Sequence, residues 1–237
     1  MLKVILILVA LLILALKIIR RVFFPTELNF VMKMLHSKIT EVKSKNFNEA
    51  FSKIATDTHY SKLKILELGI GTGENFKYFP KGSKIIISDK TDEFLSYLNE
   101  SIKNNNCQNL DISKLIVNKA ESMIDIQTNS MDAVVHTFLL CSVDDYTQVL
   151  SEIYRVLKPG GVAIFFEHSL DNINLLRKIV QKIIEPLCGQ CKFLNMKKVL
   201  KSGKFQELVI KEHIMSKFYM TIVNPIVYGY GVKACNL

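Results

Sequence analysis

A glycine-rich turn constrains this chain more than any other stretch of its sequence. Three apolar residues precede an acidic one, and three glycines follow at alternate positions: Leu63, Ile65, Leu66, Glu67, Gly69, Gly71 and Gly73. The pattern predicts a buried strand ending in a tight turn, because glycine reaches unusual dihedral angles cheaply and leaves room for a bulky ligand. We expect a short helix over residues 74–78, with its N-terminal amides facing that ligand.

The spacing of the glycines separates two classes of nucleotide-binding turn. A dinucleotide fingerprint would place its third glycine at position 74, where this chain has Glu74. The pattern Glu-x-Gly-x-Gly-x-Gly instead resembles the first motif of class I S-adenosylmethionine-dependent methyltransferases. The resemblance implies S-adenosyl-L-methionine as the cofactor.

Apolar, β-rich runs alternate with helical patterns along the rest of the chain. Strands are expected at 84–88, 115–117, 132–137 and 162–166, and helices at 26–58, 92–104, 144–157 and 172–187. This alternation predicts an α/β fold with a mostly parallel sheet covered on both faces. The methyltransferase resemblance implies a Rossmann-like sandwich with seven strands. With 237 residues, the chain has room for one such domain, which we expect over residues 61–237.

Each predicted strand ends in a polar side chain, and ligands of open α/β sheets bind outside the carboxyl ends of the strands. Glu67 can accept hydrogen bonds from the turn or the cofactor, and Asp89 can chelate two ribose hydroxyls. Glu121 can accept from an adenine amino group, although a solvated glutamate is the alternative. Thr137 ends the fourth strand, beside the expected place of the methionine portion.

Methyl transfer from a sulfonium needs alignment and a deprotonated nucleophile, and it requires no dedicated metal. His168 ends the fifth predicted strand and is the candidate catalytic base, with His136 as the alternative. Cys188 and Cys191 form a C-x-x-C pair. A zinc site would need a second pair at suitable spacing, which the other cysteines do not supply, so we expect no metal site.

The N-terminus is strongly apolar and is followed by basic residues. Residues 4–16 form an unbroken apolar run, Lys17, Arg20 and Arg21 come after it, and no signal-peptidase site follows. We therefore expect a membrane anchor at 1–25, which either spans the bilayer or lies in one leaflet and contacts lipid through residues 1–24. A helical linker over 26–60 would join it to a cytosolic catalytic domain.

The formal net charge of +9 is typical of proteins that bind nucleic acid, but the lysines are scattered and no aromatic stacking platform accompanies them. We therefore do not expect a nucleic-acid partner.

The amphipathic pattern at 172–187 has two possible roles. Packing on the sheet is its simplest role, and a substrate lid or membrane contact is the alternative.

Longer motifs narrow the resemblance further. Residues 67–79, 137–143 (Thr-Phe-Leu-Leu-Cys-Ser-Val), 167–168 (Glu-His) and 225–233 are similar to the methyltransferase-like 7 family of membrane-anchored thiol S-methyltransferases. The resemblance implies S-methylation of small lipophilic thiols at the endoplasmic reticulum or lipid droplets, with no obligate protein partner. The chain departs from that family in having no tryptophan. Methylation of a lipid or quinone in the same membrane, and a non-catalytic protein on a methyltransferase fold, remain open.

Overall fold

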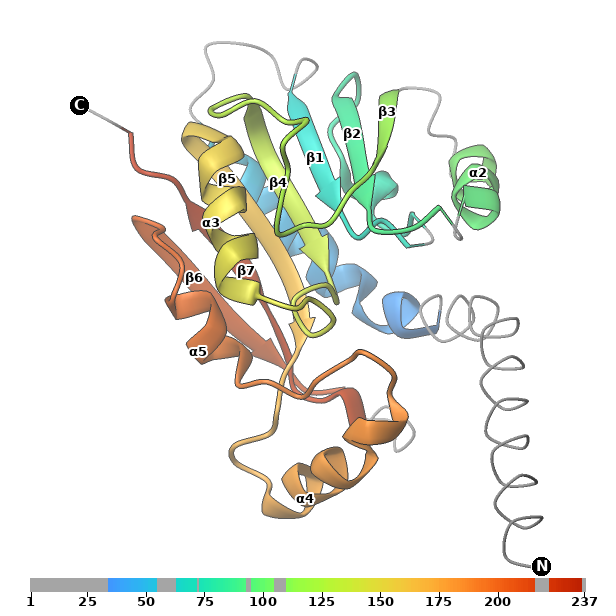
Figure 1. Ribbon diagram of the computed structural model, residues 1–237, viewed down its shortest axis with the longest axis vertical. Helices are drawn as coiled ribbons and strands as arrows, with labels where there is room; N and C mark the ends of the chain where they lie inside the picture. Colours follow the sequence, from blue (N-terminus) through green and yellow to red (C-terminus); the bar gives the residue numbers. More distant parts are fainter. Residues whose placement is uncertain are drawn as a thin grey trace, which may run out of the picture.

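The sheet has seven strands in the order β3-β2-β1-β4-β5-β7-β6 (Figure 1). The computed structural model describes residues 34–54, 63–71, 73–92, 95–104, 110–215 and 222–235. Its strands are β1 (Lys64–Leu68), β2 (Lys84–Asp89), β3 (Asp111–Val117), β4 (Met131–Thr137), β5 (Leu157–His168), β6 (Glu207–His213) and β7 (Ile226–Val232). Strand β7 runs antiparallel to both of its neighbours, β5 and β6, and the other strand pairs are parallel. The predicted mostly parallel, seven-stranded Rossmann-like sandwich is confirmed.

The helices follow the predicted alternation. The first described helix covers residues 34–51, and the others are α2 (Leu95–Asn104), α3 (Tyr146–Val156), α4 (Leu175–Ile184) and α5 (Met196–Lys201), with short 3-10 turns η2 (Phe76–Tyr78) and η4 (Glu185–Leu187). Asp145 caps α3 by accepting from the amides of Thr147 and Gln148. The helix predicted at 144–157 therefore begins two residues later than expected.

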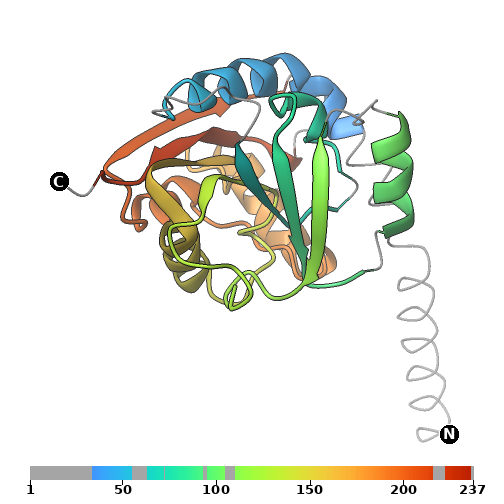
Figure 2. The ribbon, with the colours of Figure 1, turned by 90° about the horizontal axis from the view of Figure 1, so that it is seen from above.

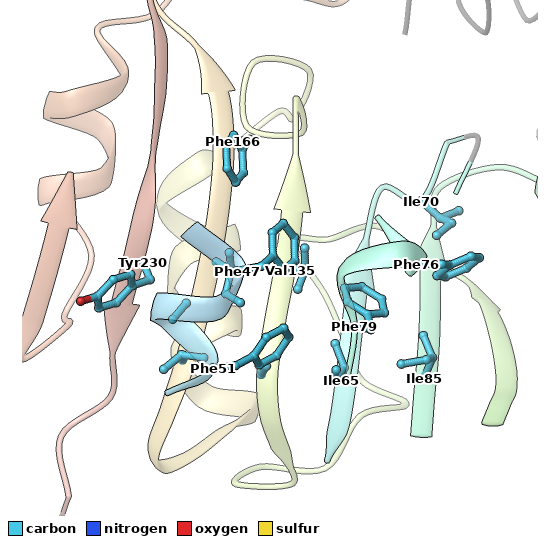
Figure 3. Close-up of a cluster of buried hydrophobic side chains, with 14 of the residues drawn as sticks. Phe47, Phe51, Ile65, Ile70, Phe76, Phe79, Ile85, Val135, Phe166 and Tyr230 are labelled. Atoms are coloured by element: carbon cyan, nitrogen blue, oxygen red, sulfur yellow. The ribbon is translucent and has the colours of Figure 1, made fainter. Parts of the chain in front are cut away.

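Successive residues of the central strands pack into two separate cores. On β4, Ala133 and Val135 belong to one core and Val134 to the other, as the two-residue period of a strand requires. Helix 34–51 covers the first core, where Phe47 and Phe51 lie over the sheet (Figure 3). Helices α3 and α5 cover the second core on the opposite face (Figure 2). Both faces of the central sheet are thus buried.

Helix α4 does not pack its apolar side on the sheet, so that expectation is wrong. Most of its large apolar residues are exposed, with Leu176 at 72% and Ile183 at 69%. The fully buried residue of α4 is a polar one, Gln181. Its amide donates to the carbonyls of Ser169, Ile222 and Asn224, so hydrogen bonds fasten this helix to the domain.

The predicted anchor at 1–25 lies outside the described residues, and of the predicted linker at 26–60 the structure describes residues 34–54. Within the described part of the chain, no helix is both long enough and apolar enough to cross a membrane.

Candidate functional site

The glycine turn follows β1 as predicted. Gly69, Gly71 and Gly73 have φ angles of 65°, 48° and 74°, a region that side-chain-bearing residues rarely adopt. A Cβ at Gly71 would meet nothing within 4 Å, whereas one at Gly69 would lie 2.9 Å from the Leu139 side chain. The turn is therefore open at Gly71, where a ligand can approach the backbone.

The helix expected over residues 74–78 is reduced to the single turn η2, which corrects the sequence prediction. Its N-cap, Asn75, makes no capping hydrogen bond with its side chain. So short a turn aligns few peptide dipoles, and the support it gives to a ligand is correspondingly small. The Asn75 side chain instead forms hydrogen bonds with buried residues beneath the glycine turn.

A buried polar network lies beneath the turn. The Asn75 Nδ2 donates to Glu67 Oε1 at 2.6 Å and to Thr137 Oγ1 at 3.1 Å, while its Oδ1 accepts from the Lys43 ammonium. Lys43 also donates to His36 Nδ1 at 3.0 Å. The network joins helix 34–51 to the ends of β1 and β4, and sequence reasoning missed Lys43 because nothing local marks a lysine for burial.

Burial controls the charges in this network. It lowers the pKa of Lys43 to about 7 and raises the pKa of Glu67 to about 7. Burial and the nearby Lys43 also hold the pKa of His36 well below its usual value, so His36 acts as a neutral acceptor. The Oε2 of Glu67 has no hydrogen-bond partner among the described residues. A buried acceptor without a partner is suited to a donor brought by a ligand.

Asp89 stands where the sequence places it, at the end of β2. Its Oδ2 accepts from the amide of Gly71 and its Oδ1 from the amide of Thr91, both at 3.3 Å. Burial raises the pKa of this carboxyl group. The structure thus brings Asp89 to the open side of the glycine turn, and its ribose-binding role stays a prediction.

Glu121 is not simply a solvated side chain. Its Oε1 accepts from the amides of Asp144 and Asp145, at 2.8 and 3.4 Å, and so holds the turn before α3. An adenine-binding role for Glu121 stays a prediction.

The end of β4 is fixed by a buried glutamate that sequence reasoning gave no role. Glu167 Oε1 accepts from His136 Nδ1 at 2.7 Å and from the amides of Leu139 and Leu140 at 3.1 and 3.3 Å. His136 is 1% exposed, and its Nδ1 is bound to Glu167; its role as the alternative base stays a prediction. Phe138, the residue directly after β4, has a φ of 54°, a strained conformation for an aromatic residue.

His168 lies in a cluster with two cysteines. Its Nε2 is 2.9 Å from Cys191 Sγ, and one ligand atom from each of Cys141, His168 and Cys191 lies within 4.8 Å of the others. The rings of Phe138 and Phe193 pack on the imidazole. A cavity of about 280 Å³ opens beside Cys191, lined also by residues 142–144, 185–186, 189–190 and 192. The cluster stands at the carboxyl ends of β4 and β5, where an acceptor would bind.

Comparison with known proteins decides the family. A family described as "Methyltransferase domain" matches residues 66–165. Human thiol S-methyltransferase TMT1B is 32% identical over 217 residues, which cover 89% of this chain and 86% of that protein. Human TMT1A is 34% identical over 177 residues, covering 73% of this chain and 71% of that protein. The chain belongs to the TMT1 family of thiol S-methyltransferases.

Membership of the TMT1 family confirms the resemblance drawn from the sequence motifs, and with it the cofactor. The protein is an S-adenosylmethionine-dependent methyltransferase. Solved structures agree on the fold: the YcgJ protein of Bacillus subtilis has a TM-score of 0.60 at 13% identity, covering 84% of this chain and all but 1% of that one. A putative sarcosine dimethylglycine methyltransferase from Galdieria sulphuraria has the same TM-score at 14% identity, covering 82% and 86%.

Proposed function

We propose that this enzyme transfers a methyl group from S-adenosylmethionine to the sulfur of a small lipophilic thiol. The observation that carries the thiol assignment is similarity to TMT1A and TMT1B along most of the chain. The site supports it, because the groups at the ends of β4 and β5 include an imidazole whose Nε2 already lies within hydrogen-bond distance of a sulfur atom.

The cofactor residues proposed are those at the carboxyl ends of β1, β2 and β4. Gly69, Gly71 and Gly73 give the backbone its close approach, and Asp89 receives the ribose hydroxyls. Glu67 has a buried oxygen available to a donor, Thr137 stands at the methionine end, and Glu121 is proposed at the adenine. When bound, S-adenosylmethionine supplies a methyl group on a sulfonium, whose departure leaves a neutral thioether.

The remaining task for the protein is to hold the acceptor sulfur as a thiolate in line with that methyl group. His168 is proposed as the proton acceptor, since the Cys191 sulfur at 2.9 Å from its Nε2 shows that a sulfur atom fits there. Phe138 and Phe193 pack on the imidazole ring and hold its orientation.

The test uses purified full-length protein, labelled cofactor and a panel of alkyl and aryl thiols, with hydroxyl analogues as matched controls. We expect transfer to the thiols and none to the alcohols. Transfer to a quinone or lipid with none to any thiol would overturn the thiol assignment and identify a lipid or quinone methyltransferase. Calorimetric titration with S-adenosylmethionine distinguishes either enzyme from a non-catalytic protein, which would not bind the cofactor. Asp89→Ala should weaken cofactor binding at least about tenfold.

Attachment to the membrane of the endoplasmic reticulum or of lipid droplets, with a cytosolic catalytic domain, is part of the proposal. Two features support it: the apolar run at 4–16, and the exposed apolar side of α4 with Arg177, Lys178 and Lys182 on the same helix. An amphipathic helix of this kind lies in the interface of anionic membranes.

The contribution of α4 can be measured apart from the N-terminus because the chain contains no tryptophan. Leu176→Trp places a single indole on the exposed side of α4, and Ile124→Trp places one at an equally exposed site elsewhere. Vesicles with anionic lipid should shift the emission of Leu176→Trp to the blue and leave that of Ile124→Trp unchanged. Equal behaviour of the two variants would remove α4 from the membrane contact.

A further inference from the structure

Cys141, His168 and Cys191 come together from three separate segments. Cys141 lies four residues beyond β4, His168 is the last residue of β5, and Cys191 follows η4. Cys141 is 2% exposed and His168 is 4% exposed, and Cys191 is partly buried. Cys188, the other half of the C-x-x-C pair, is not a member of this cluster.

Backbone contacts hold the three side chains in place. The carbonyl of Cys141 accepts from the amide of Lys192 at 2.9 Å, which sets the loop carrying Cys191 directly beside the turn after β4. The amide of Phe193 donates to Glu185 Oε2 at 2.6 Å and ties the same loop to η4. His168 sits in the sheet itself. The cluster is therefore built by the fold, and its members do not depend on one flexible loop.

The chemistry of the set points to a thiophilic ion. Two sulfurs and one imidazole nitrogen suit Zn²⁺, whose bonds of about 2.3 Å to sulfur and 2.0–2.1 Å to nitrogen put tetrahedral ligand atoms about 3.5–3.8 Å apart. Ligand atoms within 4.8 Å of one another reach that spacing by side-chain shifts of about 1 Å or less. Two thiolates and a neutral imidazole also balance the ion's charge, which lowers the cost of burial.

We propose that Cys141, His168 and Cys191 bind a zinc ion and leave its fourth coordination position for the acceptor thiol. Three protein ligands with one position for water or substrate is the pattern of catalytic zinc sites. The cavity beside Cys191 gives a small thiol a route to that position.

The role of the fourth position rests on the proposed function. An acceptor thiol that binds zinc gives up its proton to water, and its sulfur stays on the ion as a thiolate. The sulfur–methyl bond then forms as the methyl–sulfonium bond breaks. In this arrangement His168 is a zinc ligand through Nε2, and the ion takes the place of the imidazole in keeping the acceptor deprotonated.

The test is metal binding by the reduced, full-length enzyme, loaded with Zn²⁺, freed of excess ion and measured by elemental analysis. We expect about one zinc per chain, and Co²⁺ as a probe should show thiolate-to-metal absorption. Cys141→Ser, Cys191→Ser and His168→Asn should each lower zinc affinity at least about tenfold. Cys188→Ser and Cys235→Ser are the matched controls and should bind zinc as the parent does.

Two results would overturn the site: no zinc retained by the folded parent, or equal loss of zinc in Cys188→Ser and Cys191→Ser. Thiol methylation assays separate this proposal from the proposed function. Thiol methylation by a parent enzyme stripped of zinc keeps the function and overturns the zinc-bound acceptor. Zinc retention at the three residues without methylation of any thiol keeps the metal site and overturns the thiol assignment.

Discussion

The side-chain amide of Asn75 donates to Oε1 of Glu67 at 2.6 Å, and both residues are almost completely buried. Through the same amide, Glu67 is linked to the ammonium of Lys43 on helix 34–51. A buried acid and a buried base thus share one neutral bridge directly beneath the cofactor turn. Protons gained or lost by this pair must appear in the stability of the whole domain.

The pair predicts a minimum of stability near pH 7. Glu67 has a pKa raised from 4.5 to about 7, so its contribution is complete below pH 4.5 and is lost as the pH rises to 7. Lys43 has a pKa lowered from 10.5 to about 7, so its contribution is lost as the pH falls toward 7. Each slope approaches about 1.4 kcal/mol per pH unit.

Urea unfolding between pH 5 and pH 9 measures this dependence. The double variant Lys43→Met, Glu67→Gln is the comparison, because it removes both titrating groups and keeps the side-chain volumes. The difference between parent and variant should vary with pH and turn near neutrality. Parallel curves would show that neither pKa is displaced.

Alanine substitutions at Gly71 and Gly69 should distinguish the effect of the glycine turn on cofactor binding from its effect on stability. Gly71→Ala adds a methyl group that meets no protein atom, so it should cost about 1 kcal/mol from the positive φ and weaken cofactor binding at least about tenfold. Gly69→Ala meets the Leu139 side chain at 2.9 Å and should lower stability further. Calorimetry and thermal melts distinguish the two. Unchanged cofactor affinity in Gly71→Ala would place the cofactor elsewhere.

Glu167 is predicted to be a positioning residue. Glu167→Gln keeps one acceptor for His136 and the amides of Leu139 and Leu140 but removes the charge and buries a new amide group, so unfolding should become easier by about 1–3 kcal/mol. Because these contacts hold the turn that leads to Cys141, we also expect a lower kcat with little change in cofactor affinity. Glu212→Gln, on the surface opposite Lys197, is the control and should change stability by less than about 1 kcal/mol.

Gln181 should be the most costly residue of α4 to replace. Gln181→Leu leaves three carbonyls and the amide of Asp171 without their present partner, and should lower the free energy of unfolding by at least about 2 kcal/mol. Leu176→Gln on the exposed side should change it by about 0.5 kcal/mol or less. Equal effects of the two changes in urea unfolding would mean that α4 is held by apolar contacts after all.

Local patterns predicted much of this fold. Short apolar runs predicted β1, β2, β4 and β5, and the glycine spacing with Asp89 at the next strand end predicted the cofactor side of the site. These features depend on residues close together in sequence. The resemblance in the longer motifs was confirmed by the relatives, which extend across most of the chain.

Features that depend on distant residues could not be read in the same way. Cys188 and Cys191 are close in sequence, but the fold brings Cys191 to Cys141 and His168, and no local spacing indicates that grouping. The apolar residues of α4 have the spacing of a packed helix, and only tertiary structure shows that they face outward. Lys43 reaches Asn75 across 32 positions of sequence, and no periodicity reports such a contact.

Gln181 determines the rotational orientation of α4 as well as the stability of its attachment to the domain. Apolar packing tolerates rotation of a helix about its axis, whereas a hydrogen bond weakens steeply when its angle departs from linearity. A single side chain that donates to three carbonyls and accepts from one amide therefore sets the rotational angle of α4 as well as its position. Leu176 and Ile183 face outward because Gln181, on the opposite side of the helix, fixes its rotation. Substitutions at the exposed apolar positions can therefore change the chemistry of that surface without rotating the helix.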